Sequence, residues 1–325
     1  MAEIYIISGF LGAGKTTLIQ KLLKEGFQDK KIALIENDFG DISVDAALLK
    51  SGNVEVTEIN SGCICCNLSG NFIKALQELL RRFKPDAIFI EPSGVGKLSD
   101  IIKSCSDKSI RPLAKVTAKI TVADVKRFKI YLNNFGEFFE DQIQNADTIL
   151  LSHSEDFHHK VNEVIELIKE LNKNTAILSR PWDKISVEEI LPPKYNTNTP
   201  TLLHKHVKKF SYNHHNCNHV HHNEISSYAC NHSHSAEEVF DTVTIRTSKA
   251  FTTEDLKSRI SYMERNAEGT ILRAKGILKG INGYIHLQYL PENFEITNCP
   301  VNGDMLCIIG QGLNRQELIN LFDGE

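Results

Sequence analysis

Residues 9–16 have the spacing of a phosphate-binding loop. The segment Gly9-Phe10-Leu11-Gly12-Ala13-Gly14-Lys15-Thr16 fits the pattern G-x-x-x-x-G-K-[ST]. It follows a short apolar run and opens a helical pattern, which is the context that such a loop requires. Glycines let backbone N–H groups turn toward a phosphate, and the helix N-terminus adds a positive dipole end. The residues expected to contact a nucleotide here are Gly12, Ala13, Gly14, Lys15, Thr16 and Thr17.

Two side chains of this loop and one distant carboxylate have the chemistry of phosphoryl transfer. Lys15 is expected to reach the β- and γ-phosphates, and the Thr16 hydroxyl to bind Mg²⁺. Glu91 ends an apolar strand, and ligands of parallel sheets lie at the carboxyl ends of strands. We therefore expect Lys15 and Glu91 to be catalytic, with Glu91 holding Mg²⁺ through water or orienting the attacking water. Gly94 is a candidate N–H donor to the γ-phosphate. A solvated strand-end carboxylate is the alternative for Glu91.

Three cysteines form a second candidate site. Ser61-Gly62-Cys63-Ile64-Cys65-Cys66 brings three thiols onto one short loop. Zn²⁺ prefers tetrahedral sulfur and nitrogen ligands, so a fourth ligand would come from elsewhere or from water. Adjacent cysteines form a disulfide only with strain, which favours a metal. Three buried, inert cysteines are the alternative.

Apolar runs that alternate with helical patterns must position these residues. The strands are expected at 4–7, 31–35, 54–59, 87–90, 118–122, 148–151 and 175–178, and the helices at 15–23, 71–83 and 161–171. Strands that alternate with helices predict an α/β fold, a P-loop NTPase domain whose mostly parallel sheet is covered by helices.

The pattern changes twice along the chain. After residue 192 the sequence is polar, and we expect a flexible linker over 193–235. Strand and helix patterns resume at 236, which predicts a small C-terminal α+β domain over 236–325. The first domain then spans 1–192.

The expected linker is rich in histidine. Nine of the 13 histidines lie between His204 and His234, together with Cys217 and Cys230. Neutral imidazoles bind Zn²⁺, Ni²⁺, Co²⁺ and Cu²⁺. The segment is therefore expected either to collect metal or to be a polar linker with incidental histidines; an ordered site is left open.

Composition excludes several classes of partner. The formal net charge is −4, so the chain lacks the broad positive charge of a nucleic-acid-binding protein. The N-terminal apolar run is too short to span a membrane and lacks a basic flank. We expect a cytoplasmic protein that binds no nucleic acid and no membrane.

Taken together, the motifs resemble those of the CobW-type GTPases, metallochaperones and metal-insertion proteins. The matching segments are Gly9–Thr17, Glu36–Asp41, Ser61–Cys66, Glu91–Gly94, Arg273–Ile277 and Ile309–Leu313. The resemblance spans nearly the whole chain. It implies a GTPase domain in which the CxCC loop binds metal, often zinc, and couples that binding to the nucleotide state.

The resemblance also implies a switch segment at Glu36–Asp41, near the nucleotide. Carboxylates at Glu36, Asp38 or Asp41 are candidate ligands that complete a metal site or contact Mg²⁺. A solvated switch loop with no ligand role is the alternative.

One segment departs from the family. Its members usually carry Asn-Lys-x-Asp after the strand that corresponds to 148–151, and the Asp binds guanine. Here the segment reads Ser152-His153-Ser154-Glu155, so only Glu155 remains as a guanine acceptor. ATP therefore stays open beside GTP.

These observations predict a metallochaperone that hydrolyses GTP, or ATP, to deliver a transition metal, most readily zinc, to a client metalloprotein. Its cofactors would be Mg²⁺, the nucleotide and Zn²⁺. Two alternatives are an assembly factor that inserts cobalt or iron into one metalloenzyme, and a metal buffer without catalysis. A thiol redox regulator is a weaker one, and a homodimer is an open option.

Overall fold

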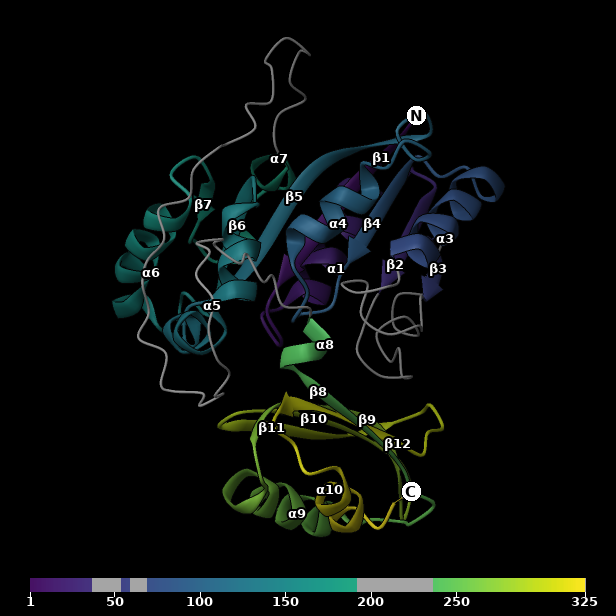
Figure 1. The fold of residues 1–325 in the computed structure, drawn as a ribbon, viewed down its shortest axis with the longest axis vertical. Coiled ribbons are helices and arrows are strands. Elements are labelled where there is room, and N and C mark those ends of the chain that lie inside the picture. The colour runs from purple at the N-terminus through teal and green to yellow at the C-terminus, as the bar shows by residue number, and fades with distance from the viewer. Residues whose placement is uncertain (37–53, 59–68, 192–235, 325) are drawn as a thin grey trace, which may run out of the picture.

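The computed structural model describes residues 1–36, 54–58, 69–191 and 236–324. These residues form two β-sheets, a large one near the N-terminus and a small one near the C-terminus (Figure 1). The expected linker, 193–235, lies outside the described residues.

The N-terminal sheet has seven strands, all parallel to their neighbours, in the order β3-β2-β4-β1-β5-β6-β7. The strands are β1 (Ala2–Gly9), β2 (Ile32–Glu36), β3 (Val54–Glu58), β4 (Ala87–Glu91), β5 (Ala114–Asp124), β6 (Thr148–Ser152) and β7 (Ala176–Leu178). The parallel α/β sheet predicted from the alternating pattern is therefore confirmed.

Helices cover both faces of this sheet. They are α1 (Lys15–Gly26), α3 (Ser69–Arg82), α4 (Leu98–Cys105), α5 (Phe128–Gln144), α6 (His158–Leu171), the 3₁₀ turn η1 (Trp182–Lys184) and α7 (Val187–Ile190). Side chains alternate along β1, so Ile4 and Ile6 pack with α3 to α6 whereas Tyr5 and Ile7 pack with α1 and α7. Among the described residues, no helix combines the length and the apolar character that crossing a bilayer requires.

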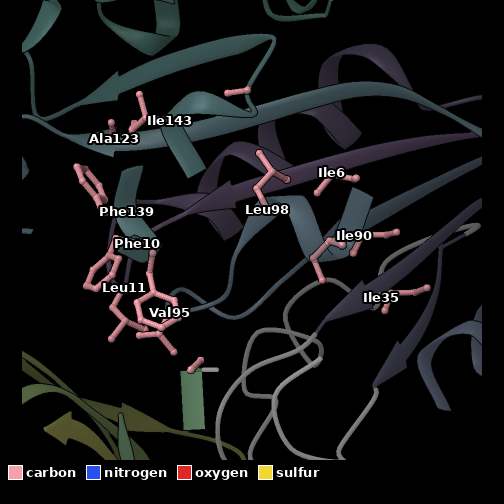
Figure 2. Packing of buried hydrophobic residues seen from close by; sticks show 14 of the residues in the cluster. Ile6, Phe10, Leu11, Ile35, Ile90, Val95, Leu98, Ala123, Phe139 and Ile143 are labelled. Carbon is pink, nitrogen blue, oxygen red and sulfur yellow. The ribbon is translucent and has the colours of Figure 1, made fainter. Parts of the chain in front are cut away.

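The first of these two cores extends to the end of β1. Figure 2 shows Ile6 and Ile90 at the sheet and Phe10, Leu11, Val95 and Phe139 beyond its edge. All of these side chains are at most 1% exposed. The phosphate loop therefore begins inside a packed apolar core.

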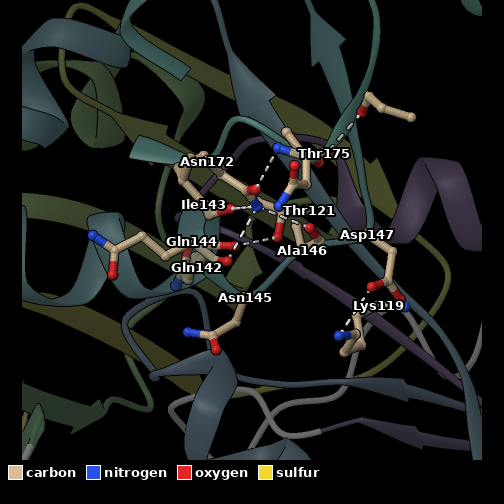
Figure 3. A network of polar contacts seen from close by, with 12 residues as sticks. Lys119, Thr121, Gln142, Ile143, Gln144, Asn145, Ala146, Asp147, Asn172 and Thr175 are labelled. Carbon is tan, nitrogen blue, oxygen red and sulfur yellow. Dashed lines mark hydrogen bonds and ion pairs between the residues drawn. The ribbon is translucent and has the colours of Figure 1, made fainter. Parts of the chain in front are cut away.

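A polar network fixes the end of α5 and the start of β6. The Asn172 side-chain amide donates to the carbonyl oxygens of Ile143, Gln144 and Ala146 at 2.9, 3.1 and 3.0 Å (Figure 3). These carbonyls lie at a helix C-terminus, where the backbone has no partner of its own. One side chain at the end of α6 thus satisfies the turn that leads into β6.

The C-terminal sheet is antiparallel and has the order β11-β10-β9-β12-β8. Its strands are β8 (Asp241–Arg246), β9 (Thr270–Gly280), β10 (Gly283–Leu290), β11 (Asn293–Cys299) and β12 (Met305–Gln311). The helices α9 (Thr253–Asn266) and α10 (Arg315–Leu321) cover the face that points away from the N-terminal sheet (Figure 1). The predicted small α+β unit is confirmed.

Phe240 joins the two sheets. It follows the short helix α8 (Ala236–Val239), which lies between the sheets in Figure 1. Its ring lies 5.1 Å from Phe138, 5.4 Å from Phe135 and 6.4 Å from Phe10, measured between ring centroids. Leu272, Cys307 and Ile309 of the second sheet belong to the same apolar cluster. The cluster is therefore shared by both halves of the chain.

Several elements differ from the sequence-based expectation. The strand 293–299 was not predicted because it is an edge strand with no buried side chain, so it lacks an apolar pattern. The helices 98–105 and 128–144 were also missed; the second contains Gly136 and a non-helical backbone at Phe135, which interrupt the helical period. The alternating pattern from Val239 to Arg246 predicts a strand, but Val239 ends the short helix α8 and the strand begins at Asp241.

Replacing Phe240 by alanine is expected to lower the free energy of unfolding by about 3–5 kcal/mol, the usual cost of emptying a packed aromatic site. The measurement is thermal and denaturant unfolding of the full chain. Tyr262→Ala is the matched control because Tyr262 is 52% exposed. Equal stabilities of the two variants would contradict the shared core.

Candidate functional site

The site is built at the carboxyl ends of β1, β4 and β2. In the parallel register Ile6 of β1 lies opposite Ile90 of β4, and Glu36 of β2 lies opposite Glu91. Parallel strands end at the same edge, so the phosphate loop after β1 and the carboxylate of Glu91 are brought together there. Glu36, a predicted metal-ligand candidate, ends β2 at the same edge and is 7% exposed.

Thr16 and Glu91 are in direct contact. The Thr16 hydroxyl is 3.2 and 3.1 Å from the two carboxylate oxygens of Glu91, to which it donates. Lys15 Nζ lies 4.0 Å from Glu91 Oε1 and donates to the carbonyl oxygen of Phe10 at 3.3 Å. Lys15 is 6% exposed. The three predicted residues thus form one compact polar group, although Thr16 and Glu91 are 75 residues apart.

The donor set suits Mg²⁺. A hydroxyl and a carboxylate are hard oxygen ligands, which this ion prefers, and it usually keeps several waters. Thr16 would bind it directly and Glu91 through water. The residues present therefore fit the ion that nucleotide chemistry requires.

The start of α1 leaves its backbone N–H groups for an anion. Gly14 is the N-cap residue, it carries no side-chain cap hydrogen bond, and the first turn of the helix holds no acidic residue. The first N–H groups of a helix have no partner within the helix, and the dipole there favours a negative charge. The segment predicted to bind phosphates therefore has the geometry and the polarity of an anion site.

Gln142 positions the loop that holds Gly94. This fully buried side chain donates to the carbonyl oxygens of Gly94 at 3.0 Å and Gly96 at 2.8 Å. A methyl group on Gly94 would lie 2.8 Å from the backbone nitrogen of Leu11, so only glycine allows this approach. Sequence reasoning missed Gln142, because α5 also carries Asn133, Asn134 and Gln144 and the sequence does not show which amide is buried.

The C-terminal domain reaches the phosphate loop through the β10–β11 turn. A methyl group on Gly12 would lie 2.3 Å from Leu290 Cδ1, so Leu290 packs directly on this glycine, whose φ is +70°. Nearby, Lys126 and Glu292 form an ion pair at 3.2 Å. Nothing in the sequence pattern indicated this contact, because it joins residues 278 positions apart.

A buried ion pair supports the same turn. Arg127 lies 2.9 Å from Asp124 at the end of β5, with side-chain exposures of 8% and 1%. The second nitrogen of its guanidinium donates to the carbonyl oxygen of Pro291 at 3.0 Å. Breaking such a pair leaves an unpaired buried charge, which is costly. The Arg127–Asp124 pair thus holds the β10–β11 turn beside the phosphate loop.

The segment Ser152–Glu155, which is expected to bind the nucleotide base, lies at the end of β6. Ser152 ends this strand and is 8% exposed, with no hydrogen-bond partner for its hydroxyl among the described residues. His153 adopts a left-handed φ of 56°, and Glu155 is exposed in the turn that follows. The structure therefore leaves Glu155 accessible to a ligand at the expected edge. Thr17, the last predicted residue of the loop, lies in the first turn of α1 and is exposed.

The predicted metal ligands Asp38, Cys63, Cys65 and Cys66 lie outside the described residues, as do the clustered histidines. Within the described residues no group of three His, Cys, Asp or Glu side chains is arranged to hold a metal ion. Cys105 and Cys307 are buried, and burial raises the pKa of the Cys105 thiol to about 12. Cys105 is therefore an unreactive core residue.

The parallel sheet, the loop at the end of β1 and the open helix N-terminus define a P-loop nucleotide-binding protein. Residues 3–179 match the family described as CobW/HypB/UreG, nucleotide-binding domain, and residues 240–324 match the cobalamin synthesis protein cobW C-terminal domain. The chain belongs to the CobW/HypB/UreG family.

Curated relatives are similar over part of the chain. A zinc chaperone CobW from Sinorhizobium sp is 35% identical over 175 residues, covering 45% of this chain and 49% of the relative. The zinc chaperone YeiR of Escherichia coli is 34% identical over 155 residues, covering 48% and 47%. The zinc-regulated GTPase metalloprotein activator 1 of Saccharomyces cerevisiae is 27% identical over 215 residues, covering 58% and 50%. The chain spans about half the length of the curated relatives it matches.

Lys15→Ala is expected to weaken GTP binding by about 10- to 100-fold, because one charge-assisted phosphate contact contributes about 1.5–3 kcal/mol. Calorimetry with GTP and Mg²⁺ measures the change. Lys24→Ala, an exposed lysine of the same helix, is the matched control and should bind as the wild type does. Unchanged affinity in Lys15→Ala would show that the nucleotide phosphates lie elsewhere.

Proposed function

We propose that this protein is a nucleotide-dependent zinc metallochaperone that hydrolyses GTP and delivers zinc to a client protein. The observation that carries the proposal is the contact of Thr16 with Glu91 beside Lys15, at the sheet edge from which the CxCC segment follows. The zinc-chaperone and GTPase names of the relatives support it.

The position of the cysteines in the sequence supports a metal site near the phosphate site. Glu58 of β3 lies opposite Glu36 of β2, which lies opposite Glu91 of β4. Cys63 follows Glu58 by only five residues, a length that spans at most about 18 Å. The proposal therefore puts the three thiols near the edge at which the triphosphate would bind. This proximity supports a coupling between metal and nucleotide.

The residues of the phosphate site have separate roles in the proposed hydrolysis. Lys15 and the backbone amides of the loop neutralise the charge that develops on the β- and γ-phosphates. Glu91 holds Mg²⁺ through water or orients the attacking water, and Gly94 donates its N–H to the γ-phosphate. Thr16 holds Mg²⁺, which when bound neutralises charge on the phosphate oxygens.

Zinc is the cargo in this proposal. Cys63, Cys65 and Cys66 bind it as thiolates, while Glu36 or Asp38 completes the site. Nucleotide binding orders the switch segment 36–41, the client metalloprotein docks, and hydrolysis releases zinc to it. The protein is proposed to act in the cytoplasm. Its proposed domains are 1–192 and 236–325, and the histidines of the linker 193–235 between them collect metal. GTP is the proposed nucleotide, with ATP as the alternative because of Ser152–Glu155.

Two other functions share the same residues. An assembly factor for one metalloenzyme would deliver cobalt or iron instead, and selectivity of the thiols for those ions over zinc would favour it. A metal buffer would use the nucleotide only as a structural ligand. Zinc transfer that is unchanged in Lys15→Ala would favour the buffer.

Replacing Cys63, Cys65 and Cys66 together by serine is expected to abolish tight zinc binding at this loop, because a serine hydroxyl is a far weaker zinc ligand than a thiolate. Competition with a chromophoric chelator measures the loss of one zinc equivalent. Cys299→Ser is the control, since Cys299 lies in an edge strand of the C-terminal sheet. A triple variant that retains this zinc equivalent would contradict the proposed cargo site.

A further inference from the structure

Trp182 lies at the carboxyl edge of the N-terminal sheet, next to the end of β6 and the segment Ser152–Glu155 that is expected to bind the nucleotide base. The ladder between β6 and β7 ends at Leu150 and Leu178. Beyond it, the indole N–H of Trp182 donates to the carbonyl oxygen of Leu151 at 2.9 Å. Leu151 directly precedes Ser152. The indole is thus tied by a hydrogen bond to the residue that directly precedes the segment Ser152–Glu155.

The other edge of the same ring reaches the phosphate loop. A methyl group on Gly14 would lie 3.2 Å from Cη2 and 3.8 Å from Cζ3 of Trp182. The indole packs against the apolar cluster under α1, which includes Ala13 and Leu18, and is only partly buried. It therefore spans the interval between the end of β6 and the loop, and it keeps part of its surface accessible.

A nucleotide whose phosphates lie on the loop must extend its base along this edge of the sheet. The indole lies between the phosphate loop and the turn after β6. A base that extends along this edge would therefore lie next to the flat apolar face of the ring. Stacking on an aromatic side chain stabilises a nucleic-acid base by about 1–3 kcal/mol, and every base offers a π-face. Stacking can therefore hold a purine without reading its hydrogen-bonding edge.

We propose that Trp182 stacks on the purine base and supplies base affinity that the degenerate segment Ser152–Glu155 does not provide. The inference rests on the proposed nucleotide-dependent function and makes it more specific. Purine nucleotides as a class bind through Trp182, and the preference for guanine over adenine depends on Glu155 alone.

The direct test uses the wild-type chain, because Trp182 is its only tryptophan. GTP and ATP with Mg²⁺ are each titrated while the fluorescence of Trp182 is followed, and inorganic tripolyphosphate serves as the probe without a base. We expect quenching by both nucleotides and none by tripolyphosphate at concentrations at which it competes with them. Equal quenching by all three, or by none while calorimetry shows binding, would overturn the inference.

Variants separate stacking from support of the loop. Trp182→Ala is expected to weaken GTP and ATP by a similar factor, about 5- to 100-fold, and to leave tripolyphosphate affinity unchanged. Trp182→Phe should keep most of the affinity, and it preserves an apolar ring if the alanine variant does not fold. Glu155→Ala is the matched control and should change the ratio of GTP to ATP affinity instead.

The experiments distinguish a failure of the stacking inference from a failure of the proposed function. An equal loss of tripolyphosphate and GTP affinity in the Trp182 variants would mean that the ring only supports the loop, and the stacking inference would fail alone. A wild-type protein that binds neither GTP nor ATP in calorimetry would overturn the proposed function and this inference with it.

Discussion

The parallel pairing of β4 between β1 and β2 is the constraint on which the site depends. It places Ile90 opposite Ile6 and Glu91 opposite Glu36, so that the loop after β1 meets a carboxylate from a distant part of the chain. A shift of one residue would turn Glu91 toward the other face of the sheet. The apolar side chains on both faces stabilise this register because they fill two packed cores.

The phosphate loop is held by side chains from both domains. Phe10 is buried among the aromatic rings of α5 and Phe240, while Leu290 packs on Gly12. Packed cores do not deform gradually, so a change at the loop would alter contacts of the C-terminal domain as well. In the proposed function, this arrangement gives a physical path from the nucleotide to the C-terminal domain.

Much of the fold follows from local patterns. The apolar runs of the parallel strands and the glycine-rich loop predicted the α/β sheet and the place of Lys15 and Thr16, and the strand end predicted Glu91. The contacts of Gln142, Leu290 and Trp182 were not predictable, because each joins segments that only the tertiary fold brings together. The edge strand 293–299 lacked a signal because it buries no side chain.

The proposed function requires that zinc binding and nucleotide binding are coupled. A zinc titration against a chromophoric competitor, run without nucleotide and with saturating GTP or ATP, tests it most directly. The account predicts that GTP changes the zinc affinity at least about tenfold, a coupling free energy of about 1.4 kcal/mol, and that Lys15→Ala loses the change. A zinc affinity that is the same with and without nucleotide would contradict it.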